Sequence, residues 1–102
     1  MPTFVKAADR SEIPDQGVKC VEIEGKRIAL FNCGGTFYAT DDECTHRGGF
    51  LSDGVVEGNE VECPLHGARF DLKTGEVLGP PAEDAIGTYT VRVMGEAVEV
   101  EV

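Results

Sequence analysis

Residues 44–46 read Cys-Thr-His, and residues 63–66 read Cys-Pro-Leu-His. Sixteen residues separate the two motifs, which together contain both histidines of the chain. Each motif supplies one thiolate and one imidazole, and these side chains bind zinc, copper and iron. The spacing therefore predicts one metal centre held by Cys44, His46, Cys63 and His66.

Zinc is one metal that fits this donor set, because structural zinc sites also take two cysteines and two histidines. Zinc fingers typically pair cysteine with cysteine and histidine with histidine along the chain. The two mixed pairs depart from that arrangement, so zinc is the disfavoured alternative. A zinc domain that only mediates assembly stays open on the residues alone.

The stretch around both motifs, about residues 41–81, differs from its flanks because it is rich in Gly, Pro, Cys and His and poor in regular strand pattern. Elsewhere, short apolar runs separated by glycine turns indicate β-strands. We expect strands at Val18–Ile23, Arg27–Phe31, Thr36–Thr40, Val55–Val56, Glu60–Cys63, Thr88–Val93 and Ala97–Val102, and one helical turn within Ala8–Ile13. This pattern predicts a single all-β domain, residues 1–102, with a loop-built subdomain between its outer strands.

Apolar residues alternate along the last two expected strands. Val98, Val100 and Val102 alternate with glutamates. Residues 89, 91 and 93 repeat the apolar alternation on the preceding strand. Because successive side chains of a strand point to opposite faces, we expect each apolar set to share one face of its strand.

Composition limits the partners and the location of the chain. Its 19 acidic and 9 basic residues give a net charge of −10, which disfavours nucleic acid and suits a basic protein face. No apolar run approaches the ~20 residues of a membrane span, and Met1–Arg10 lacks the features of a secretion signal. We therefore expect a cytoplasmic protein. Disulfides are rare there, so we interpret Cys20 and Cys33 as small buried hydrophobic residues.

The two motifs resemble the Rieske iron–sulfur family. The match continues from Cys63 through residues 67–71 (Gly-Ala-Arg-Phe-Asp) and 73–75 (Lys-Thr-Gly) to residues 79–81 (Gly-Pro-Pro), and it is specific over about Asp41–Pro81. The resemblance implies an antiparallel Rieske-type β-sandwich with a loop-built cluster-binding subdomain at about residues 41–81. It also implies one [2Fe–2S] cluster, with Cys44 and Cys63 on the inner iron and His46 and His66 on the outer iron.

The residues around the motifs distinguish subtypes of this family. Gly49 and Leu65 stand where respiratory Rieske proteins carry a disulfide, and Ala68 and Phe70 stand where those proteins carry hydroxyl donors to the cluster. Fewer hydrogen bonds to the cluster lower its potential, as does the acidic run at residues 41–43. We therefore predict a potential near the low end of the Rieske span of roughly −150 to +300 mV.

The same resemblance assigns a surrounding set of residues. The glycines of this set let backbone N–H groups approach the sulfides, or simply make turns. The prolines match a loop that covers the cluster, or form an ordinary rigid turn. Leu65, Phe50 and the prolines are expected to form an apolar rim for docking, although Phe50 fits the core equally well. Arg47 either contacts a partner or is solvated. The set is Arg47, Gly48, Gly49, Leu65, Gly67, Ala68, Pro80 and Pro81.

The resemblance points to a Rieske-type ferredoxin, a soluble one-electron carrier and not an enzyme. Such a carrier takes electrons from an NAD(P)H-dependent flavoprotein reductase and passes them to a terminal Rieske oxygenase of bacterial aromatic-ring catabolism, through transient docking. An oxygenase itself needs a mononuclear iron site with two further histidines, and this chain has none left over. A small subunit of a reductase such as nitrite reductase is the alternative.

Overall fold

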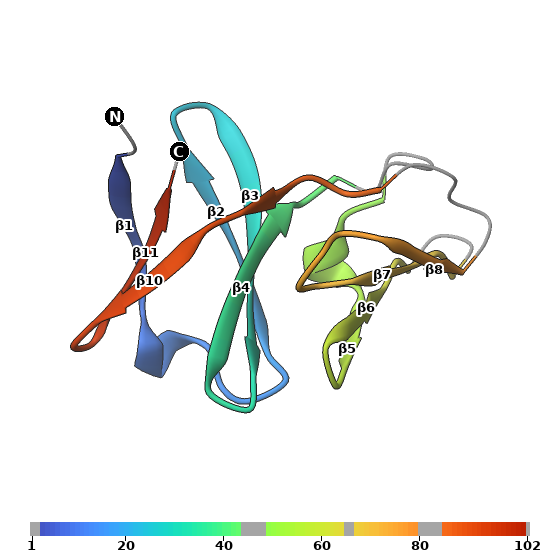
Figure 1. Cartoon of the computed structure of the whole chain (residues 1–102), viewed down its shortest axis with the longest axis horizontal. Helices are drawn as coiled ribbons and strands as arrows, with labels where there is room; N and C mark the ends of the chain where they lie inside the picture. Colours follow the sequence, from blue (N-terminus) through green and yellow to red (C-terminus); the bar gives the residue numbers. More distant parts are fainter. Residues whose placement is uncertain (1–2, 44–48, 65–66, 80–84, 102) are drawn as a thin grey trace.

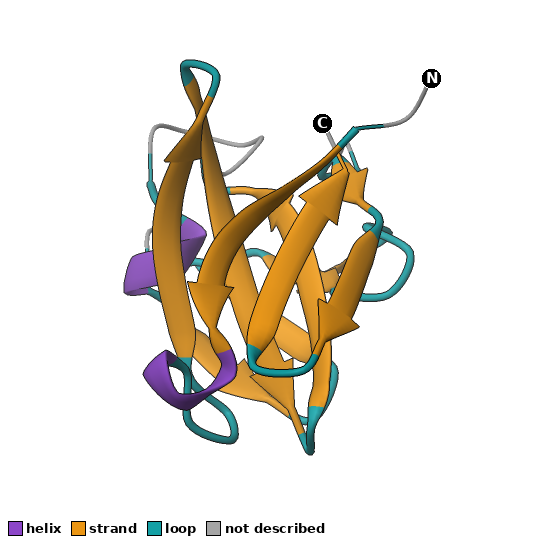
Figure 2. Cartoon of the chain, turned by 90° about the vertical axis from the view of Figure 1, so that its left-hand side faces the viewer, coloured by secondary structure: helices purple, strands orange, loops and turns teal. Residues whose placement is uncertain are grey.

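The computed structural model describes residues 3–43, 49–64, 67–79 and 85–101. Within these ranges the chain forms strands joined by antiparallel pairing and two short 3-10 turns, which confirms the all-β class (Figure 2). The elements are β1 (Phe4–Asp9), η1 (Arg10–Glu12), β2 (Val18–Ile23), β3 (Lys26–Cys33), β4 (Thr36–Asp41), η2 (Leu51–Asp53), β5 (Val55–Glu57), β6 (Glu60–Glu62), β7 (Arg69–Asp71), β8 (Val77–Gly79), β9 (Thr88–Tyr89), β10 (Val91–Met94) and β11 (Ala97–Glu101).

The strands form three sheets that stand side by side in Figure 1. One sheet has the order β1-β11-β10, the middle sheet has the order β2-β3-β4-β9, and the third has the order β5-β6-β7-β8. The third sheet lies on the far side of the middle sheet from β1, β10 and β11 (Figure 1). It comes from the stretch that carries the two metal-binding motifs.

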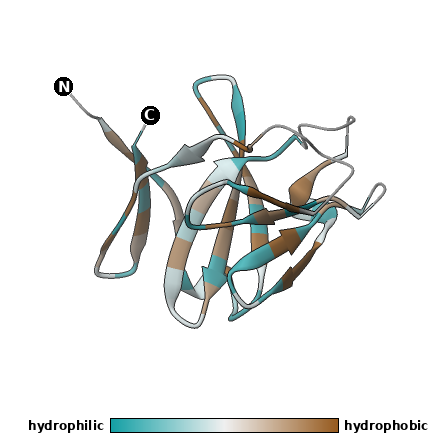
Figure 3. Ribbon diagram, turned by 45° about the vertical axis from the view of Figure 1, so that its right-hand side comes forward, coloured by the Kyte–Doolittle hydropathy of each residue, from teal (hydrophilic) through white to brown (hydrophobic). Residues whose placement is uncertain are grey.

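The middle strand β3 separates two hydrophobic cores. Ile28 and Leu30 pack with Val98 and Val100 in the core shared with the first sheet. Phe31, on the opposite side of β3, belongs to the core shared with the third sheet. Because side chains alternate along a strand, a continuous apolar run gives β3 two buried faces. Brown and teal segments alternate along many other strands in Figure 3, as expected where one face meets solvent.

Two-residue turns connect β2 to β3 and β3 to β4. Ile23 pairs with Lys26, which leaves Glu24 and Gly25 as the turn between β2 and β3. Both residues have positive φ, 52° and 79°. Such turns match the right-handed twist of the strands they join, so this glycine turn was correctly predicted from its sequence.

The structure corrects several expected strands. The motif-bearing stretch contains β7 and β8, although its sequence lacks a regular strand pattern. The expected strand Thr88–Val93 breaks at Thr90: Tyr89 pairs with Ala39 in the middle sheet, whereas Val91 pairs with Val100 in the first sheet. Val93 is 40% exposed on the edge strand β10, so the apolar face of this strand is only partly covered. The sequence pattern also gave no sign of β1.

Gly75 lies where the chain packs closely beside the third sheet. Its φ is +81°, and an added Cβ would lie 2.3 Å from the carbonyl oxygen of Ile86. We predict that Gly75→Ala destabilises the protein by ~2 kcal/mol or more beyond the cost of its backbone conformation. Urea unfolding of the intact protein, followed by circular dichroism, measures this cost.

Gly25→Ala is the matched control. Gly25 has φ +79°, and an added Cβ there meets nothing within 4 Å. Both alanine variants therefore carry the same left-handed backbone penalty of ~1–2 kcal/mol. Equal losses of unfolding free energy in the two variants would show that the contact with Ile86 carries no cost.

Candidate metal centre

The structure describes part of the predicted centre. Among the four ligands it describes Cys63, and among the surrounding residues it describes Gly49, Gly67 and Ala68. The other predicted site residues lie outside the described ranges. They are Cys44, His46, Arg47, Gly48, Leu65, His66, Pro80 and Pro81.

Cys63 follows directly after β6 and is buried, with 1% of its surface exposed. Its N–H donates to the carbonyl oxygen of Ala68 over 2.7 Å, so the ends of the 63–68 segment are held together. Gly67 has φ +73°, which glycine adopts readily, and space around its Cα is open. The second motif therefore starts from a buried cysteine, whose backbone N–H is bonded to Ala68 just beyond the motif.

One hydrophobic core contains a residue close in sequence to each internal segment that the structure does not describe. Leu51 follows the 44–48 segment, Cys63 and Ala68 flank the 65–66 segment, and Ile86 follows the 80–84 segment. All four are buried in the same cluster, together with Phe31, Val61, Phe70 and Leu72. Cys63 of the second motif and Leu51, which follows the first motif, thus lie in a common core, which fits a donor set of two cysteines and two histidines around one iron–sulfur centre.

Three consecutive acidic residues before Cys44 have three different environments. Asp41 ends β4 and accepts a short hydrogen bond of 2.5 Å from the Tyr89 hydroxyl. Asp42 is fully buried and forms an ion pair with Arg27, with 2.5 Å between Arg27 Nε and Asp42 Oδ2. Glu43 is exposed. The acidic run is therefore not a uniform charged patch, because Arg27 compensates the charge of Asp42.

Hydrogen bonds keep the Asp42 carboxylate ionised. Burial alone would raise its pKa, but donors from Arg27 and Ser52 outweigh burial and lower the pKa below its usual value. Ser52 donates through both its N–H, 2.7 Å from Oδ1, and its hydroxyl, 3.0 Å from Oδ2. Sequence reasoning missed Arg27 and Ser52, because they are far from Asp42 along the chain.

Asp41 connects the start of the first motif to the chain that follows residues 80–84. Its N–H donates to the carbonyl oxygen of Gly87 over 2.9 Å, and an added Cβ at Gly87 would lie 2.5 Å from Asp41 Oδ2. Tyr89 completes the contact through its hydroxyl. Burial and the neighbouring Asp41 raise the pKa of Tyr89 to about 12.

The other two described cysteines are free thiols. Cys33 is buried, as expected, and burial raises the pKa of its thiol. Cys20 is only half-buried, because its thiol lies at the Asp42 and Ser52 network and not in a core. Burial and the hydrogen bond with Asp42 raise the pKa of the Cys20 thiol.

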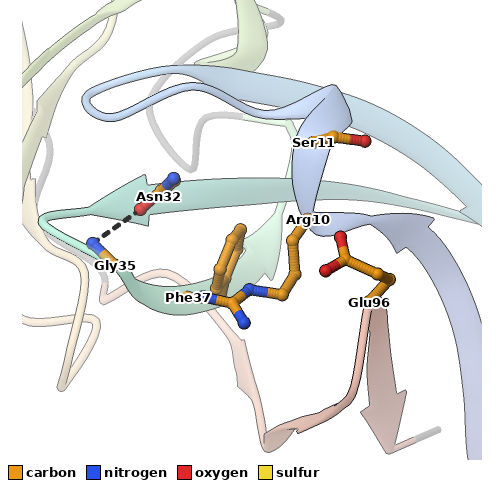
Figure 4. A pocket seen from close by; sticks show the side chains of 6 residues that line it. All are labelled: Arg10, Ser11, Asn32, Gly35, Phe37 and Glu96. Carbon is orange, nitrogen blue, oxygen red and sulfur yellow. Dashed lines mark hydrogen bonds between the residues drawn. The ribbon is translucent and has the colours of Figure 1, made fainter.

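Other features of the described part of the chain offer no competing centre. The described residues contain no group of three or more His, Cys, Asp or Glu side chains placed to hold a metal. Three of the four predicted ligands lie outside the described residues. A shallow pocket of about 330 Å³ lies beside η1 and the β3–β4 turn, where Asn32 accepts a hydrogen bond from the Gly35 N–H (Figure 4). None of its lining residues belongs to the predicted centre. No described helix is long and apolar enough to span a membrane.

Comparison with known proteins supports the metal assignment. A family model described as the Rieske [2Fe–2S] domain matches residues 3–90. The ferredoxin component of the naphthalene 1,2-dioxygenase system of Pseudomonas aeruginosa is 44% identical over 96% of this chain and 94% of its own length.

Two solved structures show the same fold. The ferredoxin of carbazole 1,9a-dioxygenase from Nocardioides aromaticivorans IC177 has a TM-score of 0.92 and 29% identity, covering 96% of each chain. A chain in a complex of reduced oxygenase and oxidised ferredoxin of carbazole 1,9a-dioxygenase has a TM-score of 0.91 and 32% identity, covering 96% of this chain and 92% of that one.

The Tyr89–Asp41 contact predicts a loss of stability at alkaline pH. The raised pKa of Tyr89 means that folding favours the neutral phenol, so its contribution is complete below pH ~10 and is lost as pH rises towards 12. We expect Tyr89→Phe to cost ~1–2 kcal/mol at neutral pH and to flatten the decline in unfolding free energy between pH 10 and 12.

Tyr38→Phe is the matched control, since it removes the other phenol of the chain. Urea unfolding of each variant at a series of pH values gives the comparison. A decline that is equally steep in Tyr89→Phe and in the parent would contradict the assigned role of this hydrogen bond.

Proposed function

The chain belongs to the Rieske [2Fe–2S] domain family, and we propose that it carries single electrons from a flavoprotein reductase to a terminal Rieske oxygenase. It carries a Rieske-type [2Fe–2S] cluster and is an electron-transfer component, not a catalyst in its own right. The observation that carries the proposal is the complete set of four ligands in two motifs, one of which starts at Cys63 in the buried core that also contains Leu51, which follows the other.

Cys44, His46, Cys63 and His66 hold the cluster in this proposal. A bound [2Fe–2S] cluster supplies a one-electron couple, and two neutral imidazoles in place of two thiolates make the site less negative and easier to reduce than an all-cysteine site. The thiolate of Cys63 is on the inner iron, in keeping with its burial. The imidazoles of His46 and His66 are on the outer iron, so electrons leave through the histidine side.

The described residues around Cys63 favour a low potential. Ala68 and Phe70 are fully buried in the core that contains Cys63, and neither carries a hydroxyl that donates to a cluster sulfur. Because such donors stabilise the extra electron, their absence at residues 68 and 70 lowers the potential. Glu43, exposed and next to Cys44, adds negative charge in the same direction.

Docking in this proposal is brief and electrostatically guided. Acidic residues exceed basic ones by ten, 19 to 9, and five of the basic side chains already form ion pairs with carboxylates of this chain. These are Lys6, Lys19, Arg27, Arg69 and Arg92. Leu78, 45% exposed on β8 just before Pro80, adds an apolar contact near the cluster-binding loops. Small interfaces of this kind suit transient electron transfer.

The remaining features of the proposal concern organisation and location. Residues 1–102 form one Rieske domain, in which about residues 41–81 build the cluster-binding subdomain. The third sheet, β5-β6-β7-β8, falls entirely within that stretch and supports this division. The chain works in the cytoplasm in this proposal, without nucleic acid or membrane as a partner, as its charge of −10 favours.

The ligand set is tested on the purified protein by iron and sulfide analysis, redox titration and low-temperature electron paramagnetic resonance. We expect two irons per chain, a Rieske-type signal and a midpoint near the low end of the family span. His46→Ala and His66→Ala should each lose the visible spectrum and most of the iron, because each imidazole holds the outer iron. Zinc without iron, or a spectrum that survives either change, would overturn the assignment.

Salt dependence tests the guided docking. We expect the rate of electron transfer from a flavoprotein reductase to fall at least severalfold between ~0.05 and ~0.5 M salt, because ions screen attraction between exposed charges. Stopped-flow measurements at fixed protein concentrations give the rate. A rate that is constant across this range would remove the acidic surface from the docking step.

A further inference from the structure

The buried Asp42 forms hydrogen bonds both with the middle sheet and with the chain that follows the first motif. Its N–H donates to the Arg27 carbonyl oxygen over 3.1 Å, and its own carbonyl oxygen accepts from the Leu51 N–H over 2.7 Å. Its carboxylate binds Arg27 on β3 and Ser52 in η2. Residue 42 therefore ties the entry of the 43–50 segment both to its exit and to the rigid middle sheet.

Arg27 holds the same segment from a second direction. Its guanidinium carbon lies 4.0 Å from the centre of the Phe50 ring, while its Nε donates to Asp42. Glu43 and Phe50 form an isolated antiparallel bridge, so the segment begins and ends side by side. The Arg27 side chain thus contacts Asp42, which precedes this bridge, and the ring of Phe50 at the end of the segment.

Stability alone does not account for this arrangement. An ion pair of this kind contributes little net stability, because the Arg27 side chain is 48% exposed and burial of the Asp42 charge offsets much of their attraction. Its hydrogen bonds do impose one geometry, since both carboxylate oxygens of Asp42 already have donors from fixed directions. The network is therefore better suited to defining where the first motif starts and ends.

We propose that Asp42, with Arg27 and Ser52, is a positioning residue that holds the Cys44 and His46 segment in register with Cys63. This inference rests on the proposed ligand set. The same interactions bring the exit of the segment, at Leu51, into the core that contains Cys63. Changes in the network should consequently alter cluster retention and the spectroscopic signature without touching a ligand.

The test uses the protein with its cluster, as isolated, and measures the rate of cluster loss with a chelator and the g values after reduction. Asp42→Asn should lose the cluster about tenfold faster than the parent, because it weakens hydrogen bonds between charged groups. Ser52→Ala should lose it several times faster and shift the g values, although no charge changes. Ser52→Thr, which keeps the hydroxyl, should restore both measurements.

Two controls separate positioning from charge and from general stability. Glu43→Gln removes one exposed negative charge next to Cys44 and should keep the parent rate of cluster loss and g values. Val98→Ala weakens the buried core beside the first sheet, away from the third sheet (Figure 1), and should lower the unfolding midpoint while leaving the g values unchanged.

The outcomes distinguish this inference from the proposed function. If Ser52→Ala keeps the parent rate and g values while His46→Ala loses the cluster, the positioning role is wrong and the ligand set stands. If Val98→Ala shifts the g values as much as Ser52→Ala does, the network acts only through stability. If His46→Ala itself keeps the cluster, the proposed ligand set fails first. If Asp42→Asn does not fold, the comparison of Ser52→Ala with Ser52→Thr tests the positioning role.

Discussion

The burial of β3 on both faces is the constraint on which the rest of the structure depends. Ile28 and Leu30 face the core shared with the first sheet. Ala29 and Phe31 face the other core, which contains Cys63. Fully burying a large apolar side chain is worth ~1.5–3 kcal/mol, so a shift of register by one residue would exchange the contents of both cores. The same strand supplies Arg27, so the framework and the network at Asp42 share one rigid element.

Charge is distributed unevenly around the centre, and this follows from the fold. Asp41, the last residue of β4, accepts a hydrogen bond from Tyr89, whereas Asp42, just beyond the strand, binds Arg27 and Ser52. The inner side, at Cys63, is surrounded by aliphatic and aromatic side chains in a medium of low dielectric. The protein thus combines an apolar core around Cys63 with a strongly negative net charge.

The sequence predicted the class, the strands with strong alternation and the motif itself, because these depend on local pattern. β2, β4 and the turn at Glu24 and Gly25 lie where expected. β5 and β6, which are equally short, were expected from the Gly58 turn between them, whereas β7 and β8 were missed because residues 72–76 join them without so short a turn. The break at Thr90 was missed because pairing partners far along the chain decide it. The partners of Asp42 come from β3 and η2, and spacing does not reveal contacts of that range.

The pairing of β1 with β11 has a consequence for how the protein is made. Phe4 pairs with Glu101, and β11 lies between β1 and β10 in its sheet. During synthesis this sheet cannot assemble until residues near 101 have left the ribosome, and contacts so distant in sequence close slowly. Both metal-binding motifs emerge well before that moment. A nascent chain therefore exposes its cysteines before its framework closes, and we expect protection of these thiols to matter most during translation.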